Sequence, residues 1–244
     1  MSDFTPEELF DAVDRIVLDL LSKQGIEEPP VDALMLVQKA FGYAVTIEEA
    51  EEDEEPRQYG DRPPPRRRGR ELVLKPELSA AGRNSMAARA CAKELIPPVL
   101  SKLGIAPGTE QRGAATQLIG VIAPRLLLPT RWFARDLRKA NNDLARLRER
   151  YPTVAYETLA LRILDQDEPC VIAIVDDGTV TTRRSNGTAV TKVLTEAERK
   201  CIEQVLEHRE PRTVRFDDWT ARGWAIPGGP FNRIILRSVP DELY

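Results

Sequence analysis

The chain has 244 residues, 42% of them hydrophobic and 30% charged, and its formal net charge at pH 7 is −4. This composition is ordinary for a globular protein with a buried core, and the charge argues against a strongly basic nucleic-acid binder. No apolar run approaches the roughly 20 residues that a membrane span needs. The acidic start lacks the basic and apolar regions of a signal peptide. We therefore expect a cytoplasmic protein that does not bind membranes.

Cysteine and histidine, the commonest zinc ligands, are scarce. Cys91, Cys170 and Cys201 lie far apart and form no CxxC pair, which favours buried free thiols over a disulfide framework. His208 is the single histidine of the chain. A conventional metal centre therefore has few residues from which it could be built.

The first 50 residues predict two helices and a strand. Thr5 to Glu8 form a capping box with proline at the first helical position, and apolar residues recur at helical spacing up to Gly25. The stretch "PPVDALMLVQKAF" predicts a short helix ended by Gly42, and "YAVTIEE" predicts a strand. Residues 49–69 have no apolar stripe, so we expect a flexible insertion there. A polybasic binding site is the alternative, but the adjoining acidic run largely cancels its charge.

The middle of the chain predicts a strand and a series of helices. "ELVLK" is typical of a strand, and a buried helix is expected from Arg83 to Leu95. Pro97 and Pro98 should end or kink that helix, because proline removes a hydrogen-bond donor and clashes with the preceding turn. The next segment is also helical, with breaks expected near Pro124 and Pro129.

The remainder predicts a helix pair followed by β structure. "NNDLARLRERYPTVAYETLALRIL" favours two short helices around a Tyr-Pro-Thr turn. "CVIAIVDDGTVTTRRS" favours a hairpin around Asp177-Gly178, since glycine accepts positive φ. Thr195 to Glu198 is a second capping box, which opens a helix through Leu206. The tail from Trp219 predicts a turn and a strand.

In order and spacing, these segments resemble the ImmA/IrrE family of zinc-dependent metallo-endopeptidases over about residues 6 to 186. "GIEEPPVDALMLVQKAFGYAVTIEE" is similar to the N-terminal segment of that family, and Arg83–Leu95 occupies the place of its HExxH helix. "TQLIGVIAPRLLLPTRWF" is similar to the segment that supplies a glutamate ligand. "RERYPTVAYETLALRILDQDEPCVIAIVDDGTVTTRRSN" is similar to a helix pair and hairpin of some members.

The resemblance implies an α+β fold with two domains. Residues 1–150 would form a degenerate ImmA/IrrE-like metallopeptidase domain, which is a zincin-like helical domain with a small β-sheet. Residues 151–244 would form a small C-terminal α/β region, made of a compact helix pair and a β-hairpin.

The residues at the positions of the family's zinc site differ from the family pattern. In an HExxH helix, two histidines four residues apart hold Zn²⁺, and the glutamate acts as general base. Counting from Arg83 places Ala90 and Glu94 at the histidine positions and Cys91 at the base. Counting back from Pro129 places Thr116 at the third ligand. We therefore expect no catalytic residue, no zinc and no other cofactor at this pseudo-active site.

A second register leads to the same expectation. Counting back from "PPVLSKLG" places Arg89, Ala90 and Lys93 at the three positions of the motif, again without a histidine. Cys91 is best interpreted as a small buried apolar residue, because a nucleophilic cysteine needs a histidine partner. Glu94 should reach solvent or pair with Arg89 or Lys93.

These observations favour a regulatory or protein-binding module on a metallo-endopeptidase fold, a pseudoenzyme whose partner is a protein. Known substrates of the family include DNA-binding repressors, so the resemblance implies a transcription regulator as the partner. One alternative is an active metallo-endopeptidase that cleaves a transcriptional repressor. Another is a helix-turn-helix DNA-binding protein, but its recognition helix, Val154 to Leu164, is too apolar to read a major groove, so we do not expect nucleic acid as a partner.

Overall fold

The computed structural model describes residues 4–48, 70–105, 112–187, 189–228 and 231–241. The chain divides into two compact units. The first unit runs to Phe133 and also includes Arg150–Ala155, and the second comprises Ala134–Glu149 and the residues from Tyr156 onward. The expected flexible insertion at 49–69 lies outside the described residues.

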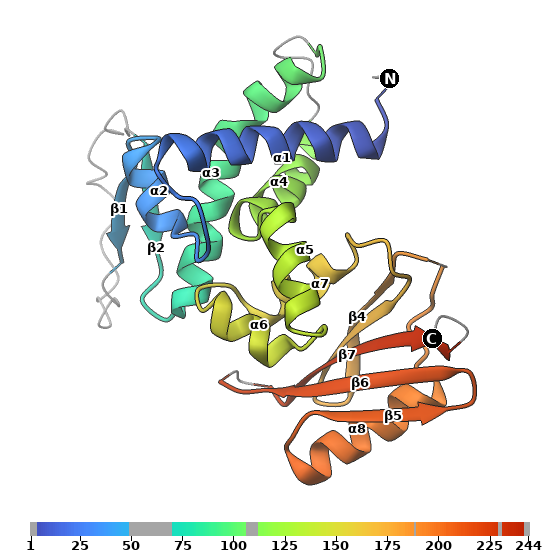
Figure 1. Cartoon of the computed structure of the whole chain (residues 1–244). Coiled ribbons are helices and arrows are strands. Elements are labelled where there is room, and N and C mark those ends of the chain that lie inside the picture. The colour runs from blue at the N-terminus through green and yellow to red at the C-terminus, as the bar shows by residue number, and fades with distance from the viewer. Residues whose placement is uncertain (1–3, 49–69, 106–111, 188, 229–230, 242–244) are drawn as a thin grey trace. The chain divides into compact units, whose positions relative to one another are not determined.

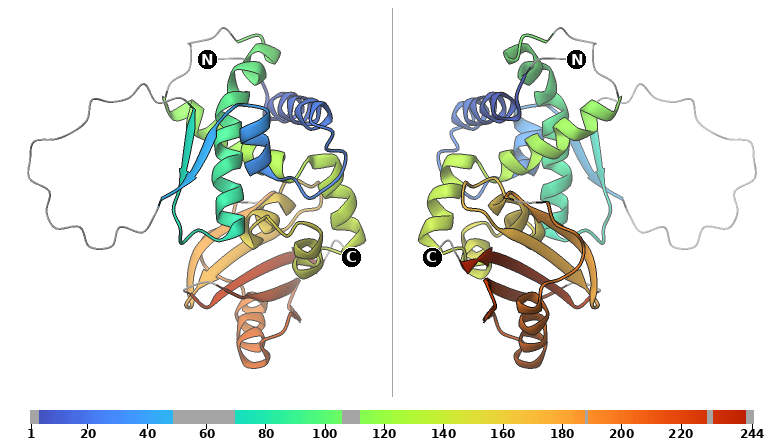
Figure 2. Two further views of the ribbon diagram at one scale, coloured as in Figure 1. Left: turned by 90° about the vertical axis from the view of Figure 1, so that its left-hand side faces the viewer. Right: turned by 90° about the vertical axis from the view of Figure 1, so that its right-hand side faces the viewer.

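The first unit is built around one long central helix. Its elements are α1 (Pro6–Lys23), α2 (Ala33–Lys39), β1 (Ala44–Ile47), β2 (Glu71–Leu74), α3 (Ala80–Lys102), α4 (Arg112–Leu127) and the start of α5 (Thr130–Lys139). Helix α3 contacts α1, α2, α4 and β2 (Figure 1). Strands β1 and β2 pair in parallel and run alongside α3 (Figure 2).

The capping box predicted at the start of the chain is confirmed. The Thr5 hydroxyl accepts a hydrogen bond from the Glu8 backbone N–H at 3.2 Å, and the Glu8 carboxylate accepts one from the Thr5 N–H at 2.8 Å. These two bonds satisfy donors that the first turn of α1 would otherwise leave unpaired.

Of the end or kink predicted for the central helix at its proline pair, the end does not occur. Helix α3 starts at Ala80 and continues through Pro97 and Pro98 to Lys102. Ile96 before the pair and Val99 after it are both buried. Continuous tertiary packing on both sides of the prolines therefore outweighs the hydrogen bonds that the prolines remove.

Of the two breaks predicted further along, only the second occurs. Helix α4 includes Pro124, with Ile122 and Leu126 fully buried on either side of it. The helix then ends before Pro129, and α5 begins at Thr130. Buried packing again sustains a helix through a proline, whereas Pro129 lies between two helices.

The second unit pairs a five-stranded antiparallel sheet with helices. Its elements are α6 (Leu144–Arg150, whose last residue lies in the first unit), α7 (Tyr156–Ile163), β3 (Val171–Asp176), β4 (Thr179–Ser185), α8 (Glu196–His208), β5 (Arg212–Phe216), β6 (Trp219–Ile226) and β7 (Arg233–Pro240). The strand order is β4-β3-β7-β6-β5. The predicted helix pair and β3–β4 hairpin are present, and Asp177 and Gly178 both have positive φ.

The tail from Trp219, predicted as a turn and one strand, forms two strands, β6 and β7, and β5 precedes it. A turn at Asp217, with φ of 49°, joins β5 to β6. Gly223 lies in the middle of β6, where glycine argues against a strand. The packing explains it: a Cβ at Gly223 would lie 2.9 Å from Leu236 Cδ2 and 3.0 Å from Cys201 Sγ. Helix α8 lies so close to the sheet that only glycine fits.

The α+β class predicted from the sequence is confirmed by these helices and sheets. Helix α8 packs on β5, β6 and β7 and buries Ala197, Cys201 and Val205 against the sheet. In the described part of the chain, no helix combines the length and apolar character needed to span a bilayer.

A fully buried glutamate fixes α8 on this sheet. Glu198 of the second capping box accepts a hydrogen bond from the Thr195 N–H at 2.7 Å and one from the Ser238 hydroxyl at 3.0 Å. Its carboxylate also pairs with the buried Arg183 guanidinium at 3.1 Å. One side chain therefore joins the start of α8 to β4 and β7.

Replacing Glu198 with alanine should destabilise the second unit by about 3–5 kcal/mol, because Arg183 would remain buried without its partner. Glu8→Ala is the matched control, since Glu8 holds the same capping-box position in α1 but is exposed. It should cost about 1 kcal/mol or less. Urea unfolding followed by tryptophan fluorescence measures both, because Trp132 lies in the first unit and Trp219 and Trp224 lie in the second. Equal losses for the two variants would contradict this role of Glu198.

Candidate functional site

The candidate site lies on α3, whose buried face consists of small residues between Ala87 and Ala92. Ala87, Ala88, Cys91 and Ala92 have no measurable exposure. Side chains this small let neighbouring helices approach α3 closely. Ser79 caps the start of the helix, where its hydroxyl accepts a hydrogen bond from the Gly82 N–H at 3.1 Å. The surroundings of residues 87–92 are therefore a packed helix core.

Ala90 and Cys91 are both buried in this core. Ala90 offers no donor atom to a metal. The Cys91 thiol donates to the carbonyl oxygen of Ala33 at 3.8 Å, and burial raises its pKa to about 12. A thiol with this pKa is protonated at neutral pH, whereas metal ligands and nucleophiles are thiolates. The interpretation of Cys91 as a small buried apolar residue agrees with this environment.

Glu94 is the one carboxylate among the four predicted positions, and both of its oxygens have partners. The Tyr43 hydroxyl donates to Oε1 at 2.8 Å, and the Arg70 guanidinium lies 2.9 Å from Oε2. Arg70 also donates to the carbonyl oxygen of Phe41 at 2.9 Å. Burial first, and then Glu94, raise the pKa of Tyr43. The carboxylate thus ties α3 to the segments before β1 and β2.

The partners predicted for Glu94 were therefore wrong. Arg89 and Lys93 are exposed on α3, whereas Glu94 is partly buried. Its partner Arg70 lies outside the helix, beyond the reach of local sequence spacing. The alternative register fares no better, since it would place two exposed cationic side chains at ligand positions.

Thr116 is exposed on α4 and makes no described hydrogen bond to Glu94 or Cys91. The structure thus brings Ala90, Cys91 and Glu94 together on one helix but does not add Thr116 to a common buried space. Over residues 4–48, 70–105, 112–187, 189–228 and 231–241, no three His, Cys, Asp or Glu side chains converge as a metal site would need. These residues do not fit zinc, which takes at least three such ligands from the protein.

Asn84 is a structural residue of α3 that sequence reasoning missed. It is 2% exposed, and its Oδ1 accepts a hydrogen bond from the Ala33 N–H at 2.7 Å. Its Nδ2 donates to the carbonyl oxygens of Val31 and Thr153, each at 3.2 Å. The sequence did offer a signal for this role, a single amide side chain within an alanine-rich helix. A polar group buried there needs hydrogen-bond partners, which indicates a structural role.

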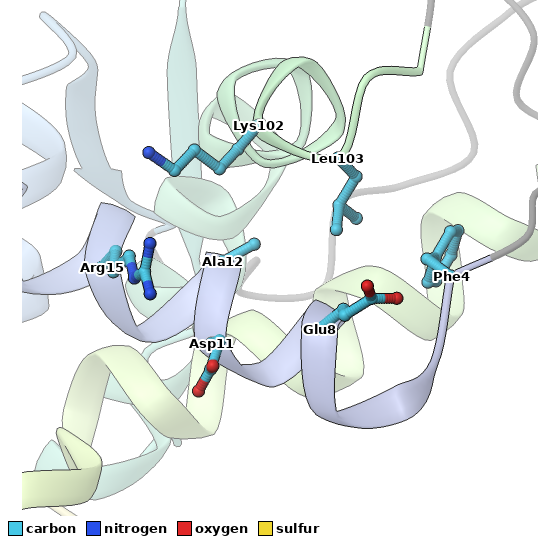
Figure 3. A pocket seen from close by; sticks show the side chains of 7 residues that line it. All are labelled: Phe4, Glu8, Asp11, Ala12, Arg15, Lys102 and Leu103. Atoms are coloured by element: carbon cyan, nitrogen blue, oxygen red, sulfur yellow. The ribbon is translucent and has the colours of Figure 1, made fainter.

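A surface hollow of about 340 Å³ lies elsewhere in the first unit. Figure 3 shows the side chains that line it, which come from α1, from the residues before it and from the C-terminal end of α3: Phe4, Glu8, Asp11, Ala12, Arg15, Lys102 and Leu103. None of the four predicted site residues belongs to it. Its four charged side chains are exposed and of mixed sign, so it lacks the desolvated polar groups that mark a binding pocket.

The expected recognition helix of the helix pair, α7, packs on the sheet. Along α7, Leu159, Ala160, Arg162 and Ile163 are buried, and no residue from Tyr156 to Ile163 is fully exposed. Helix α7 packs on β3 and β7. A recognition helix must present side chains to the major groove, and α7 in this structure presents its residues to the sheet.

Comparisons with solved structures show a likeness in fold. No family model and no curated protein matches the chain. A solved structure named Mycobacterium tuberculosis transcriptional regulator aligns with a TM-score of 0.61 at 18% sequence identity. The alignment covers 96% of this chain and 80% of that one. At this identity, the likeness establishes a shared fold only.

The folded protein should resist thiol reagents at pH 8. The cysteines are all buried, and burial raises the pKa of Cys170 and takes those of Cys91 and Cys201 to about 12. At pH 8 only about one such thiol in 10⁴ is ionised. Titration with a chromogenic disulfide should therefore detect almost no thiol in the native protein and all three in urea. Rapid labelling of native Cys91 would show that its thiol is reactive.

Proposed function

We propose that this chain is an ImmA/IrrE-like regulatory protein that binds a protein partner and has lost zinc and catalysis. The observation that carries this proposal is the state of the Glu94 carboxylate. One oxygen of this carboxylate is paired with Arg70, and the other accepts a hydrogen bond from Tyr43. The carboxylate is therefore poorly placed to bind a metal cation. Its neighbours Ala90 and Cys91 are buried without a usable ligand atom.

Two features support a regulatory role in transcription. The resemblance to the ImmA/IrrE family implies a DNA-binding repressor as the natural counterpart of the fold. The solved structure of similar fold is itself named a transcriptional regulator. We accordingly propose a transcription regulator as the partner that this protein recognises.

An active metallo-endopeptidase that cleaves a repressor is the second candidate in the family. It would need at least three protein ligands converging on zinc. The inherited positions supply one carboxylate, and that carboxylate is ion-paired. The helix-turn-helix alternative is weaker still, because α7 is largely occupied by contacts with the sheet.

Metal content tests the proposal directly. Protein purified without chelator should carry far less than one zinc per chain by elemental analysis, because no three donors converge among the residues that the structure describes. With zinc or manganese added, it should leave a candidate repressor intact. Stoichiometric zinc that is lost in Glu94→Gln or Cys91→Ser, but kept in Glu8→Gln, would instead support the peptidase. Glu8 is the control because it is an exposed carboxylate on α1.

A further inference from the structure

Helix α5 carries an exposed stripe of cationic side chains. Arg131, Arg135, Arg138 and Lys139 are all exposed. At 100° per residue they fall within one quarter-turn or so of the helix surface, and Arg131 and Arg138 lie about 10 Å apart along the axis. Asp136 is the single acidic residue of α5, and it is buried. We call these four residues the basic stripe.

The charges of the basic stripe do not favour the stability of α5. Like charges four residues apart repel by a few tenths of a kcal/mol, and Arg131–Arg135 and Arg135–Lys139 are both such pairs. Arg131 lies in the first turn, where the positive end of the helix dipole disfavours a cation. Among the described residues, Arg131 has no ion-pair partner.

Part of the stripe has a structural explanation. Arg138 and Lys139 lie in the last turn of α5, where cations complement the dipole. Arg135 is partly neutralised by Asp136, with 2.9 Å between Nε and Oδ1. Arg131 has no such explanation. A solvated helix face normally mixes charges of both signs, and this one carries cations only.

We infer that the basic stripe is a docking surface for an acidic segment of a protein partner. Guanidinium groups bind carboxylates in bidentate geometry, and a helical segment with carboxylates at one- and two-turn spacing would match Arg131, Arg135 and Arg138. The partly buried Trp132 lies beside the stripe and offers an apolar edge to the same ligand. This inference rests on the proposed protein-binding function and specifies the chemistry of the partner.

An acidic polypeptide fits the stripe better than nucleic acid does. The chain has a net charge of −4, which opposes accumulation on a polyanion the length of DNA. Sequence-specific DNA binding also needs an element that reaches the bases, and α7 is largely covered by the sheet. A short acidic segment needs only the stripe itself.

Fluorescence anisotropy with the full chain tests this inference. The probe is a labelled peptide of about 20 residues, with glutamates spaced four and three residues apart along one helical face. A peptide of this length can form a partly populated helix. A peptide of the same composition with scattered glutamates and a random DNA duplex are the comparisons. Arg131→Gln/Arg138→Gln removes two stripe charges, and Arg184→Gln/Lys192→Gln removes two exposed charges of the second unit as a matched control.

The stripe variant should bind the patterned peptide about five-fold more weakly, because each exposed ion pair contributes modestly. The control variant should match the parent protein, and added salt should weaken binding. Equal binding by the two variants, or tighter binding of the duplex than of the patterned peptide, would overturn the inference. Neither result bears on zinc content, so the inference can fail while the proposed function stands. Stoichiometric zinc would contradict the proposed function, whereas the peptide-binding result would be unaffected.

Discussion

Close packing around α3 is the constraint on which the first unit depends. Ala87, Ala88 and Ala92 are buried without side chains beyond Cβ, so α1, α2 and α4 can approach the helix closely. Asn84 then fixes the register of the helix by bonding to the backbone of Val31 and Ala33. Enlarging any of these alanines would force neighbouring helices apart. The same packing explains why Ala90 and Cys91 serve the core of the unit.

The two units each use a glutamate on a helix, and the two carboxylates differ in surroundings. Glu198 is fully buried and satisfied by Arg183, Ser238 and the Thr195 backbone, so it acts purely as a structural anchor. Glu94 is partly exposed and paired with an Arg70 side chain that is itself 55% exposed. Exposed pairs contribute little to stability, whereas a buried pair is costly to break. Glu94 is therefore the carboxylate whose partners can be changed without unfolding the protein.

Local signals predicted the fold well where the determining contacts are close in sequence. Both capping boxes and the Asp177-Gly178 turn act within four residues, and each forms as expected. The local signals failed where contacts between residues distant in sequence determine the secondary structure. Pro97 remains helical because packing continues around it, and Gly223 remains in a strand because α8 lies against it. At the candidate site, local spacing did not predict Arg70 as the partner of Glu94, because the two residues meet only in the folded chain.

Each of the two units contains two separate segments of the chain, which limits where the gene could be cut or recombined. Tyr151 packs edge-on against Phe133 in the first unit, with ring centroids 6.1 Å apart. Asp143, which precedes it in the chain, caps α6 and pairs with Arg222 in the second unit. A single break near residue 150 would therefore strip an aromatic ring from one core and an ion pair from the other. Because of this interleaving, no single crossover point near residue 150 separates the two units with both contacts intact.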